Sequence, residues 1–293
     1  MDSQLNQNRS CLTTLGIVTL YNPDVEKATM NILQYLPYIQ CLIIWDNSPV
    51  DTGVKKSIMK SLKPFKEKIV WKGAGVNFGI AKALNYGFKY AKEYSYKLIL
   101  TMDQDSKWDN FKSYLDDVLS LLQQGRIEVF TPNISGMDKK EELYIDKYFF
   151  ITSGTLFPIE VIEKTWDADE TFSVDALDVD YSIRVRNEGF HVTTLTKHIL
   201  DHHIGTPFRS KFFRISTPNY NAKRTYGMAR NHIILCKKHW NLLDKSQVIY
   251  YIKEYIVYKF VRILLLENDK VFKLKMLFKG IYDGINYDMR SAN

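Results

Sequence analysis

The stretch Leu98 to Ser106, which reads LILTMDQDS, decides the fold of this chain. It is an apolar run followed by two carboxylates that are spaced one residue apart. Such a run is typical of a strand that is buried on both faces of a parallel sheet. Open α/β sheets bind their ligands at the carboxyl ends of their strands, which is where Asp103 and Asp105 are expected to lie.

Two carboxylates at one strand end can bind a hard divalent cation that bridges the phosphates of a nucleotide. Because side chains alternate along a strand, Asp103 and Asp105 point the same way if the chain stays extended. The alternative is a turn in which Asp and Ser cap a helix that begins near Trp108. An Asp-x-Asp pair does not decide between the two by itself, so the rest of the chain must.

The first hundred residues alternate between expected strands and helices. We expect strands at 15–20, 41–45, 68–71 and 97–102, helices at about 25–36 and 53–62, and a third helix that reaches about Lys92. This alternation predicts a parallel sheet with right-handed crossovers. Three of the four strands end in acidic or amide residues, as a nucleotide-binding edge would, although Asn, Asp and Pro dominate turns in any protein.

A glycine-rich loop at 73–87 leads into the third helix. It lacks the GxxxxGK[ST] pattern of a phosphate-binding P-loop, and its glycines do not fit the GxGxxG pattern of dinucleotide-binding proteins. The sequence therefore disfavours a dinucleotide-dependent oxidoreductase.

The middle of the chain is less regular. We expect a helix at about 108–124, strands at 127–131 and 190–195, and a strand, a tight bend and a second strand within 148–158, followed by a helix. A further helix has Asp175, Asp178 and Asp180 near its start and Gly189 past its end. Asp175 and Asp178 should share a face, with Val179 and Ile183 facing the core. Such acids can serve only to compensate the helix dipole.

Basic and apolar patterns mark the last third of the chain. Residues 207–240 contain eight Lys or Arg and no acid, which suits a diphosphate or an anionic surface. Apolar residues at helical spacing then predict helices over about 246–288, packed on the domain. We also expect these helices to aid reversible attachment to a membrane surface. The charges of Lys253, Lys259 and Arg262 exclude a membrane span.

Composition sets further bounds on the 293 residues. The net charge of +7 suggests an anionic partner, which could be a nucleotide, a nucleic acid or an acidic membrane surface. Three scattered cysteines without a CxxC spacing indicate neither a zinc site nor a disulfide framework, and fit a reducing, cytosolic setting. The first ten residues are polar and are not expected to be a signal peptide. The sequence contains no uncharged apolar run of about 18 residues, so we expect no membrane span.

Eight stretches, in order, resemble the family 2 inverting glycosyltransferases, in particular their bacterial rhamnosyltransferase-like branch. They are IVTLYNP, WDNS, N-x-G-I-A-x-A-L-N-x-G, MDQDS, FFITSGTLF, D-x-x-D-x-D-Y-S-I-R, H-H-I-G and R-x-Y-x-x-x-R-N, and they cover roughly residues 15–235. The resemblance implies an α/β class GT-A fold, which is a mixed, mostly parallel sheet flanked by helices, here with a C-terminal helical extension.

The resemblance also implies a domain plan. A GT-A catalytic domain would cover 1–240, with a loose tail at 1–12, a nucleotide-binding half at 13–107 and an acceptor and catalytic half at 108–240. Residues 241–293 would form the helical extension.

By the same resemblance, the chain would use a nucleotide-sugar donor and a divalent metal, Mg²⁺ or Mn²⁺. Asp46 would contact the base or ribose, and Asn77 would lie near the nucleotide. Asp103 would face the ribose or the metal, and Asp105 would be the principal metal ligand. Asn22 and Gln104 complete the donor-binding residues expected from the first half.

The second half would supply the remaining groups. Asp178 matches the general base, although Leu177 precedes it where the family usually has Glu; Asp180 also stands in place of a Glu. His202 aligns with a histidine that could bind the metal or the diphosphate. The sequence leaves open whether His202 or its neighbour His203 is the functional histidine. The guanidinium groups of Arg224 and Arg230 would neutralise the diphosphate.

These parts suit the chemistry of sugar transfer. Inversion needs a carboxylate to take the proton of the acceptor hydroxyl as its oxygen attacks the anomeric carbon. The departing nucleoside diphosphate needs a cation to absorb its charge. Unlike in a glycoside hydrolase, no acid and base need to flank the same bond.

We therefore expect a glycosyltransferase that moves rhamnose from dTDP-rhamnose onto a lipid-linked or polysaccharide glycan in cell-surface glycan synthesis, of the O-antigen or capsule type. It would be cytoplasmic and peripheral at the inner face of the membrane. An alternative is a galactosyl- or glucosyltransferase that uses a UDP-sugar. A nucleotidyltransferase is a weaker alternative, because such an enzyme would be expected to carry a basic glycine-rich loop near the N-terminus, which this sequence lacks. A nucleic-acid-binding protein is a weaker alternative that the basic and aromatic residues at 207–240 permit. No nucleic-acid partner is expected, because the acidic strand ends repel a phosphate backbone unless a metal is bound.

Overall fold

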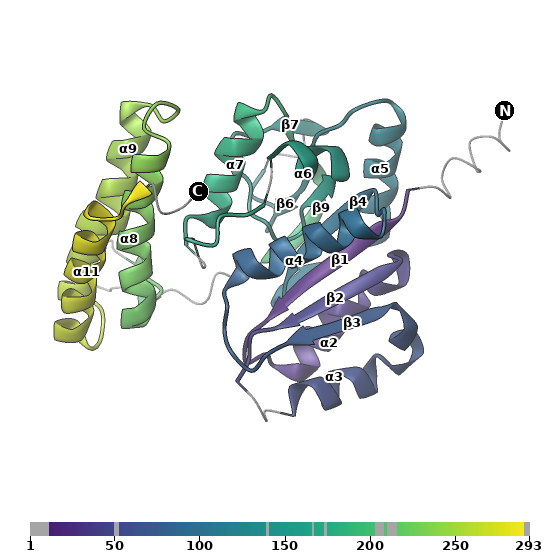
Figure 1. Cartoon of the computed structure of the whole chain (residues 1–293), viewed down its shortest axis with the longest axis horizontal. Coiled ribbons are helices and arrows are strands. Elements are labelled where there is room, and N and C mark those ends of the chain that lie inside the picture. Colours follow the sequence, from purple (N-terminus) through teal and green to yellow (C-terminus); the bar gives the residue numbers. More distant parts are fainter. Residues whose placement is uncertain are drawn as a thin grey trace, which may run out of the picture. The chain divides into compact units, whose positions relative to one another are not determined.

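A computed structural model describes residues 12–49, 53–138, 141–165, 167–172, 175–202, 208–209 and 216–289 (Figure 1). The chain divides into two compact units. The first, called here the sheet unit, comprises Met1–Ala168 and Arg184–His202. The second, the helical unit, comprises Asp169–Ile183 and His203–Asn293.

Four parallel strands build one half of the sheet, as the sequence predicts. They are β1 (Thr14–Leu20), β2 (Cys41–Asp46), β3 (Ile69–Gly73) and β4 (Leu98–Asp103), in the order β3-β2-β1-β4. Leu20 of β1 pairs with Asp46, and Thr19 pairs with Asp103. The carboxyl ends of these strands are therefore level, and both acids lie at the same edge of the sheet.

The other half of the sheet is mixed. Its strands are β5 (Ser106–Trp108), β6 (Val129–Ile134), β7 (Tyr144–Asp146), β8 (Leu156–Pro158) and β9 (Val192–His202). Strand β8 is antiparallel to both β4 and β6, and β9 is parallel to β6. The short strands β5 and β7 are antiparallel to β9. The predicted mixed, mostly parallel sheet flanked by helices is thereby confirmed.

Helices cover both faces of the sheet. The sheet unit contains α2 (Val25–Leu33), α3 (Val54–Ser61), α4 (Ile80–Glu93), α5 (Phe111–Gln123) and α6 (Ile159–Thr165). Helix α4 crosses one face (Figure 1), and its Gly87 comes so close to β1 that an added Cβ would lie 2.8 Å from Ile17 Cδ1. Apolar residues of α2, α3 and α5 form one core cluster with the opposite side chains of β1, β2 and β4. Burial on both faces explains the continuous apolar run of β4.

Three elements of the sheet unit differ from those predicted from the sequence. The helix expected from Trp108 begins at Phe111, because β5 takes Ser106–Trp108 and Asn110 caps the helix. The strand expected before the bend near 153 does not form, since Thr155 instead turns back to hydrogen-bond Thr101 of β4. The strand expected at 190–195 is longer and continues to His202.

The helical unit consists mainly of helices. They are α8 (Ala222–Lys238), α9 (Lys245–Ile252), α10 (Tyr258–Leu265), α11 (Lys270–Ile285) and a π-helical turn between α9 and α10. Helix α7 (Leu177–Asn187) begins in this unit. Helix α11 packs along α8 through Gly280 and Gly284, where an added Cβ would lie 2.5 Å from Tyr226 O and 2.9 Å from Arg230 O. No helix of the described residues is long and apolar enough to cross a membrane.

The two units do not follow the predicted domain boundary near residue 240, because α8 groups with the C-terminal helices. Where the catalytic domain ends therefore stays a prediction. The apolar repeat read from the sequence also behaves differently from expectation. Of the apolar residues in this repeat, Ile263 is buried but Ile249 is largely exposed, and the charged Lys259 is fully buried.

Candidate active site

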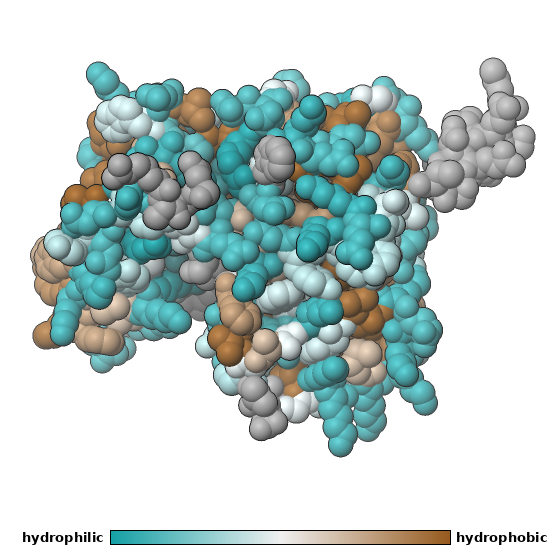
Figure 2. Space-filling view, viewed as in Figure 1, coloured by the Kyte–Doolittle hydropathy of each residue, from teal (hydrophilic) through white to brown (hydrophobic). Residues whose placement is uncertain are grey.

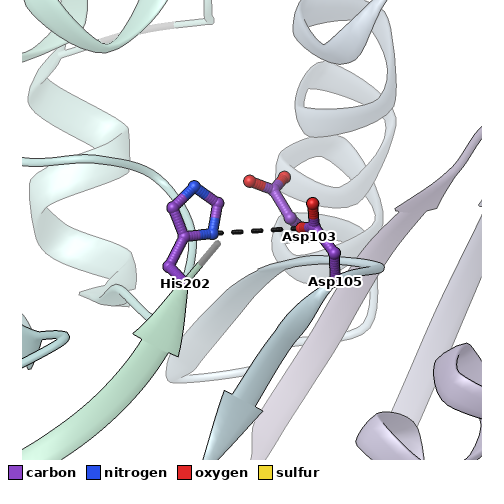
Figure 3. Close-up of side chains that lie close together, drawn as sticks. All are labelled: Asp103, Asp105 and His202. Carbon is purple, nitrogen blue, oxygen red and sulfur yellow. Dashed lines mark ion pairs between the residues drawn. The ribbon is translucent and has the colours of Figure 1, made fainter. Parts of the chain in front are cut away.

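Asp103, Asp105 and His202 lie together at one edge of the sheet (Figure 3). Asp103 ends β4, Asp105 lies in the turn that leads into β5, and His202 ends β9. One potential ligand atom from each residue lies within 4.8 Å of the others, and His202 Nδ1 is 3.9 Å from Asp105 Oδ1. Pairing of β5 with β9 brings the histidine here from almost a hundred residues away.

The electrostatics of this cluster favour a cation. Burial of Asp103, together with the charge of Asp105, raises the pKa of Asp103 to about 7. Asp105 is half exposed, and its carboxylate repels that of Asp103. Two carboxylates and one imidazole are donors that divalent ions such as Mn²⁺ accept. The residues present therefore fit a divalent metal.

Asp46, Asn22 and Gln104 lie at the ends of neighbouring strands. Asp46 Oδ1 accepts a hydrogen bond from Ser48 N at 2.9 Å, and Ser48 Oγ accepts one from Asn22 N at 2.9 Å. The Gln104 amide accepts from Tyr21 N at 2.7 Å and donates to Tyr21 O at 3.2 Å. Gln104 therefore ties the loop after β1 to the turn that carries Asp105.

Asn77 shapes the loop before α4. Its Oδ1 accepts a hydrogen bond from Gly79 N at 2.9 Å. Asn47 grips the same loop, since its Oδ1 accepts from Phe78 N at 3.1 Å and its Nδ2 donates to Gly79 O at 3.2 Å. Asn47 is buried, and the sequence had not singled it out. Its signal was its place in the polar WDNS ending of β2.

An open cavity of about 740 Å³ lies beside Asp46. It is lined by Asp46, Ser48, Pro49, Gly53, Val54, Lys55, Lys56, Met59, Trp71, Gly73, Ala74 and Gly75. Gly73 allows β3 to approach β2, since a Cβ there would lie 2.9 Å from Asp46 O. Lys55, Lys56 and Trp71 were not predicted as site residues. Two cations and an aromatic ring in one cavity suit an anionic aromatic ligand.

Asp178 and Asp180 differ sharply although both lie in the first turn of α7. Asp178 is partly exposed. Asp180 is fully buried, 2.8 Å from both Lys238 Nζ and His239 Nε2. The expectation that Val179 faces the core is wrong, because Asp180 occupies the buried position and Val179 is partly exposed.

Asp175 is paired with Arg224 rather than placed on the helix. It lies before α7, and its Oδ1 is 3.3 Å from Arg224 Nη2. The expectation that it shares a helix face with Asp178 is therefore wrong. Burial raises the pKa of Asp175 even though Arg224 opposes the shift. The Arg224 guanidinium also lies 3.9 Å from the centre of the Tyr220 ring.

Arg230 is held by other groups of the helical unit. Its Nη1 donates to Thr171 O at 3.2 Å and to Asn231 Oδ1 at 2.8 Å, and its guanidinium lies over the Tyr287 ring. Both arginines expected to bind the diphosphate thus make protein contacts. The sheet unit brings together Asp103, Asp105 and His202, while His203 lies outside the described residues.

Solved structures of glycosyltransferases share this fold. TarS of S. aureus (residues 1–349, in complex with UDP-GlcNAc) superposes with a TM-score of 0.59 at 12% identity, over 93% of this chain and 80% of that one. Mannosyltransferase PcManGT from Pyrobaculum calidifontis, in complex with GDP-Man and Mn²⁺, gives 0.57 at 13% identity, over 95% and 77%. GalNAc-T7 with UDP, GalNAc and Mn²⁺ gives 0.56 at 12% identity, over 85% and 57%.

A curated relative connects the chain to one branch of these enzymes. The dTDP-rhamnosyl transferase RfbF of Shigella flexneri is 24% identical over 244 residues, which are 76% of this chain and 79% of RfbF. The chain has the GT-A fold and is similar in sequence to a dTDP-rhamnosyl transferase. The resemblance read from the sequence is thereby confirmed, and glycosyltransferase function is supported.

The chain spans little more than half of the GalNAc-T7 chain and half of a longer TarS chain. No family model matches the sequence. Two of the three structures described above contain Mn²⁺, which agrees with the cation-binding chemistry of the Asp103, Asp105 and His202 cluster.

Proposed function

We propose that this chain is an inverting, metal-dependent rhamnosyltransferase that uses dTDP-rhamnose and a lipid-linked or polysaccharide acceptor of cell-surface glycan synthesis. The observation that carries the proposal is the cluster of Asp103, Asp105 and His202 at the strand edge. The likeness to RfbF supports the choice of donor sugar. A UDP-hexose is the second candidate, because TarS and GalNAc-T7 were crystallised with UDP or a UDP-sugar.

The sheet unit would bind the donor. Trp71 and the lysines of the cavity offer an aromatic surface and positive charge to a nucleoside diphosphate, and Asp46 can accept hydrogen bonds from its base or ribose. Asn22, Asn77 and Gln104 would hold the loops around it. A divalent ion bound by Asp105, Asp103 and His202 would supply charge neutralisation for the departing diphosphate.

Asp178 is the proposed general base. Asp178 is partly exposed in the first turn of α7, where the N-terminus of the helix favours negative charge. We propose that Asp178 takes the proton of the acceptor hydroxyl as that oxygen attacks the anomeric carbon and the nucleoside diphosphate departs. Asp180 is unsuited to the role, since burial and ion pairs with Lys238 and His239 hold its carboxylate. Arg224 and Arg230 keep the proposed diphosphate role only if that ligand replaces their present contacts.

The outer side of α11 supports a peripheral membrane location. Val271, Phe272, Phe278, Tyr282 and Ile285 are each more than half exposed. Lys275 and Lys279 lie among them, exposed. Brown and tan atoms are visible along this helix in Figure 2. Apolar rings flanked by lysines suit the interface of an anionic bilayer, and we propose reversible attachment at the inner face of the cell membrane.

The test is nucleotide binding by the full chain. Melting curves with dTDP, UDP or GDP, each with and without Mn²⁺ or Mg²⁺, should show the largest stabilisation with dTDP and metal. Asp105→Ala should keep the metal-free melting temperature but lose the metal-dependent part, and should remove most transfer activity. Equal responses to all nucleotides, or retained metal dependence in Asp105→Ala, would contradict the donor and the metal assignment, respectively.

A further inference from the structure

Two buried serines connect the side chain of His202 to the C-terminal end of β4. Ser106 is fully buried, and its Oγ lies 2.8 Å from His202 Nδ1 and 2.6 Å from Ser153 Oγ. Ser153 Oγ in turn accepts a hydrogen bond from Asp103 N at 3.1 Å. A continuous hydrogen-bonded chain thus runs from the backbone of one carboxylate ligand to the imidazole.

The fold fixes both ends of this chain. Ser106 pairs directly with His202 across the antiparallel strands β5 and β9. Residues that pair in this way place their side chains on the same face of a sheet, within contact distance. The contact between the hydroxyl and the imidazole therefore follows from the strand register and does not depend on a flexible side chain.

Ser153 is held equally firmly by its turn. Gly154 N donates to Thr101 O at 2.7 Å, which anchors the turn to β4. Gly154 has φ +79°, and an added Cβ would lie 2.6 Å from a methyl group of Leu200. Only glycine fits this position, so the turn that presents Ser153 is specified by the sequence.

We propose that Ser106, supported by Ser153, is a positioning residue that orients the His202 imidazole toward the cation. This inference rests on the proposed metal-dependent function. When Ser106 Oγ accepts a hydrogen bond from Nδ1–H, Nε2 keeps its lone pair for a cation. The Ser106 hydroxyl then donates to Ser153, which has a second lone pair for Asp103 N–H. Histidine ligands commonly donate their other ring N–H in this manner, which fixes the tautomer.

The arrangement makes a prediction that a purely structural role would not. If Nε2 is the ligand, loss of the Ser106 hydroxyl frees the ring to turn and weakens the cation. If Nδ1 is the ligand, Ser106 competes with the cation for the same nitrogen, and removing the hydroxyl should leave binding unchanged or tighten it. Because Nδ1 lies 3.9 Å from Asp105 Oδ1, the experiment must distinguish coordination through Nδ1 from coordination through Nε2.

The experiment measures Mn²⁺ binding by calorimetry on the full chain, in wild type, Ser106→Ala, Ser153→Ala and Ser135→Ala. Ser135 is the matched control, since among the described residues its hydroxyl contacts the backbone of His202, at 3.4 Å, and not its ring. We expect Ser106→Ala to weaken Mn²⁺ about 10–100-fold, the usual effect of losing such a partner. Ser153→Ala should weaken it less, and Ser135→Ala should match wild type. Unchanged or tighter binding in Ser106→Ala overturns the inference.

A second readout needs no metal and also guards against misfolding. ¹⁵N spectra of the histidine ring, recorded on metal-free protein at pH 8, report which nitrogen carries the proton. Ser106→Ala should change the tautomer ratio of His202 while the spectra of His232 and His239 stay as in wild type. An unaltered His202 signal overturns the inference even if the chain binds Mn²⁺. If wild type binds no Mn²⁺ and Ser106→Ala still changes the tautomer, the metal assignment fails and the hydrogen bond stands.

Discussion

The sheet unit and the helical unit distribute their charged and apolar residues in opposite ways. In the sheet unit, apolar side chains fill both faces of the strands, and the carboxylates Asp103 and Asp105 lie at the strand ends. In the helical unit, Lys259, Glu267 and Lys273 are buried, while aromatic side chains of α11 are exposed. Sequence patterns therefore indicate chemistry directly in the first unit, whereas in the second the contacts decide which charges are structural.

The buried charges of the helical unit form one network. Glu267 accepts hydrogen bonds from Lys259 Nζ at 2.7 Å, Lys273 Nζ at 2.9 Å and Thr217 Oγ1 at 2.6 Å. Although burial raises the pKa of Glu267, these bonds bring it below its usual value. The network joins the segment before α8 to α10 and α11. It does not face solvent, so Lys259 and Lys273 are not available to contact a membrane surface.

The largest expected effect separates the two carboxylates of α7. Asp178→Asn should slow single-turnover transfer at saturating donor by roughly 10²–10⁴-fold, the usual contribution of a general base, with little change in melting temperature. Asp180→Asn should instead lower the melting temperature, because it leaves Lys238 and His239 beside a buried neutral amide. Asp175→Asn should slow transfer only mildly. Equal and small rate losses at Asp178 and Asp175 would place the base elsewhere.

The buried network should dominate stability in the helical unit. Glu267→Gln leaves two buried lysines without their counter-charge and should lower the free energy of unfolding at pH 7 by about 3–5 kcal/mol. The control is Asp116→Asn in the sheet unit, whose pair with Lys112 is exposed and should contribute under about 1 kcal/mol. Urea titrations give both values. Similar losses in the two variants would remove the contrast between the units.

The exposed rings of α11 should matter for binding and not for folding. Replacing Phe272 and Phe278 by Ser should weaken binding to phosphatidylglycerol vesicles by roughly 10²-fold, because each ring loses its apolar transfer energy. Melting temperature and transfer to a water-soluble acceptor should stay near wild type. Met30→Ser, which removes an exposed apolar side chain of the sheet unit, should bind vesicles normally. A self-association surface would instead show as a lower oligomeric mass in the double variant without loss of vesicle binding.

The smallest effect concerns pH at the strand edge. Because the pKa of Asp103 is raised to about 7, its carboxyl holds a proton below that pH in the metal-free protein. A cation must displace this proton, so Mn²⁺ affinity should fall about tenfold from pH 8 to pH 6 and level off above pH 8. Calorimetry in buffers of different ionisation enthalpy should detect proton release near pH 6. Asp103→Asn should abolish the release.

Much of the sheet unit follows from sequence alone. The apolar runs of β1, β2 and β4 and the cap at Asp24 set local structure that tertiary contacts do not override. Strand β5 was missed because three residues carry no periodic pattern. It forms through pairing with the distant β9, and the same long-range pairing places His202 beside Asp105. The resemblance to a known family, and not spacing, had assigned that histidine.

The helical unit was harder to predict in a specific sense. Periodicity identified its helices, but the assignment of a face failed where a lysine packs inside, as Lys259 does. A pattern of apolar and charged letters does not reveal a counter-ion supplied by another element, here Glu267 from the turn before α11. The same reason explains Asp180, whose partners lie at the end of α8 and beyond.

The two glycines of α11 fix the rotational setting of that helix. Successive residues of an α-helix are about 100° apart around its axis, and only Gly280 and Gly284 fit against the backbone of α8. A turn by one residue would drive Ile281 and Ile285 into carbonyl groups of α8, where no side chain has space. Rotation of α11 therefore cannot bury the exposed rings. These rings must therefore either be buried against a binding partner or a surface, or remain exposed to solvent.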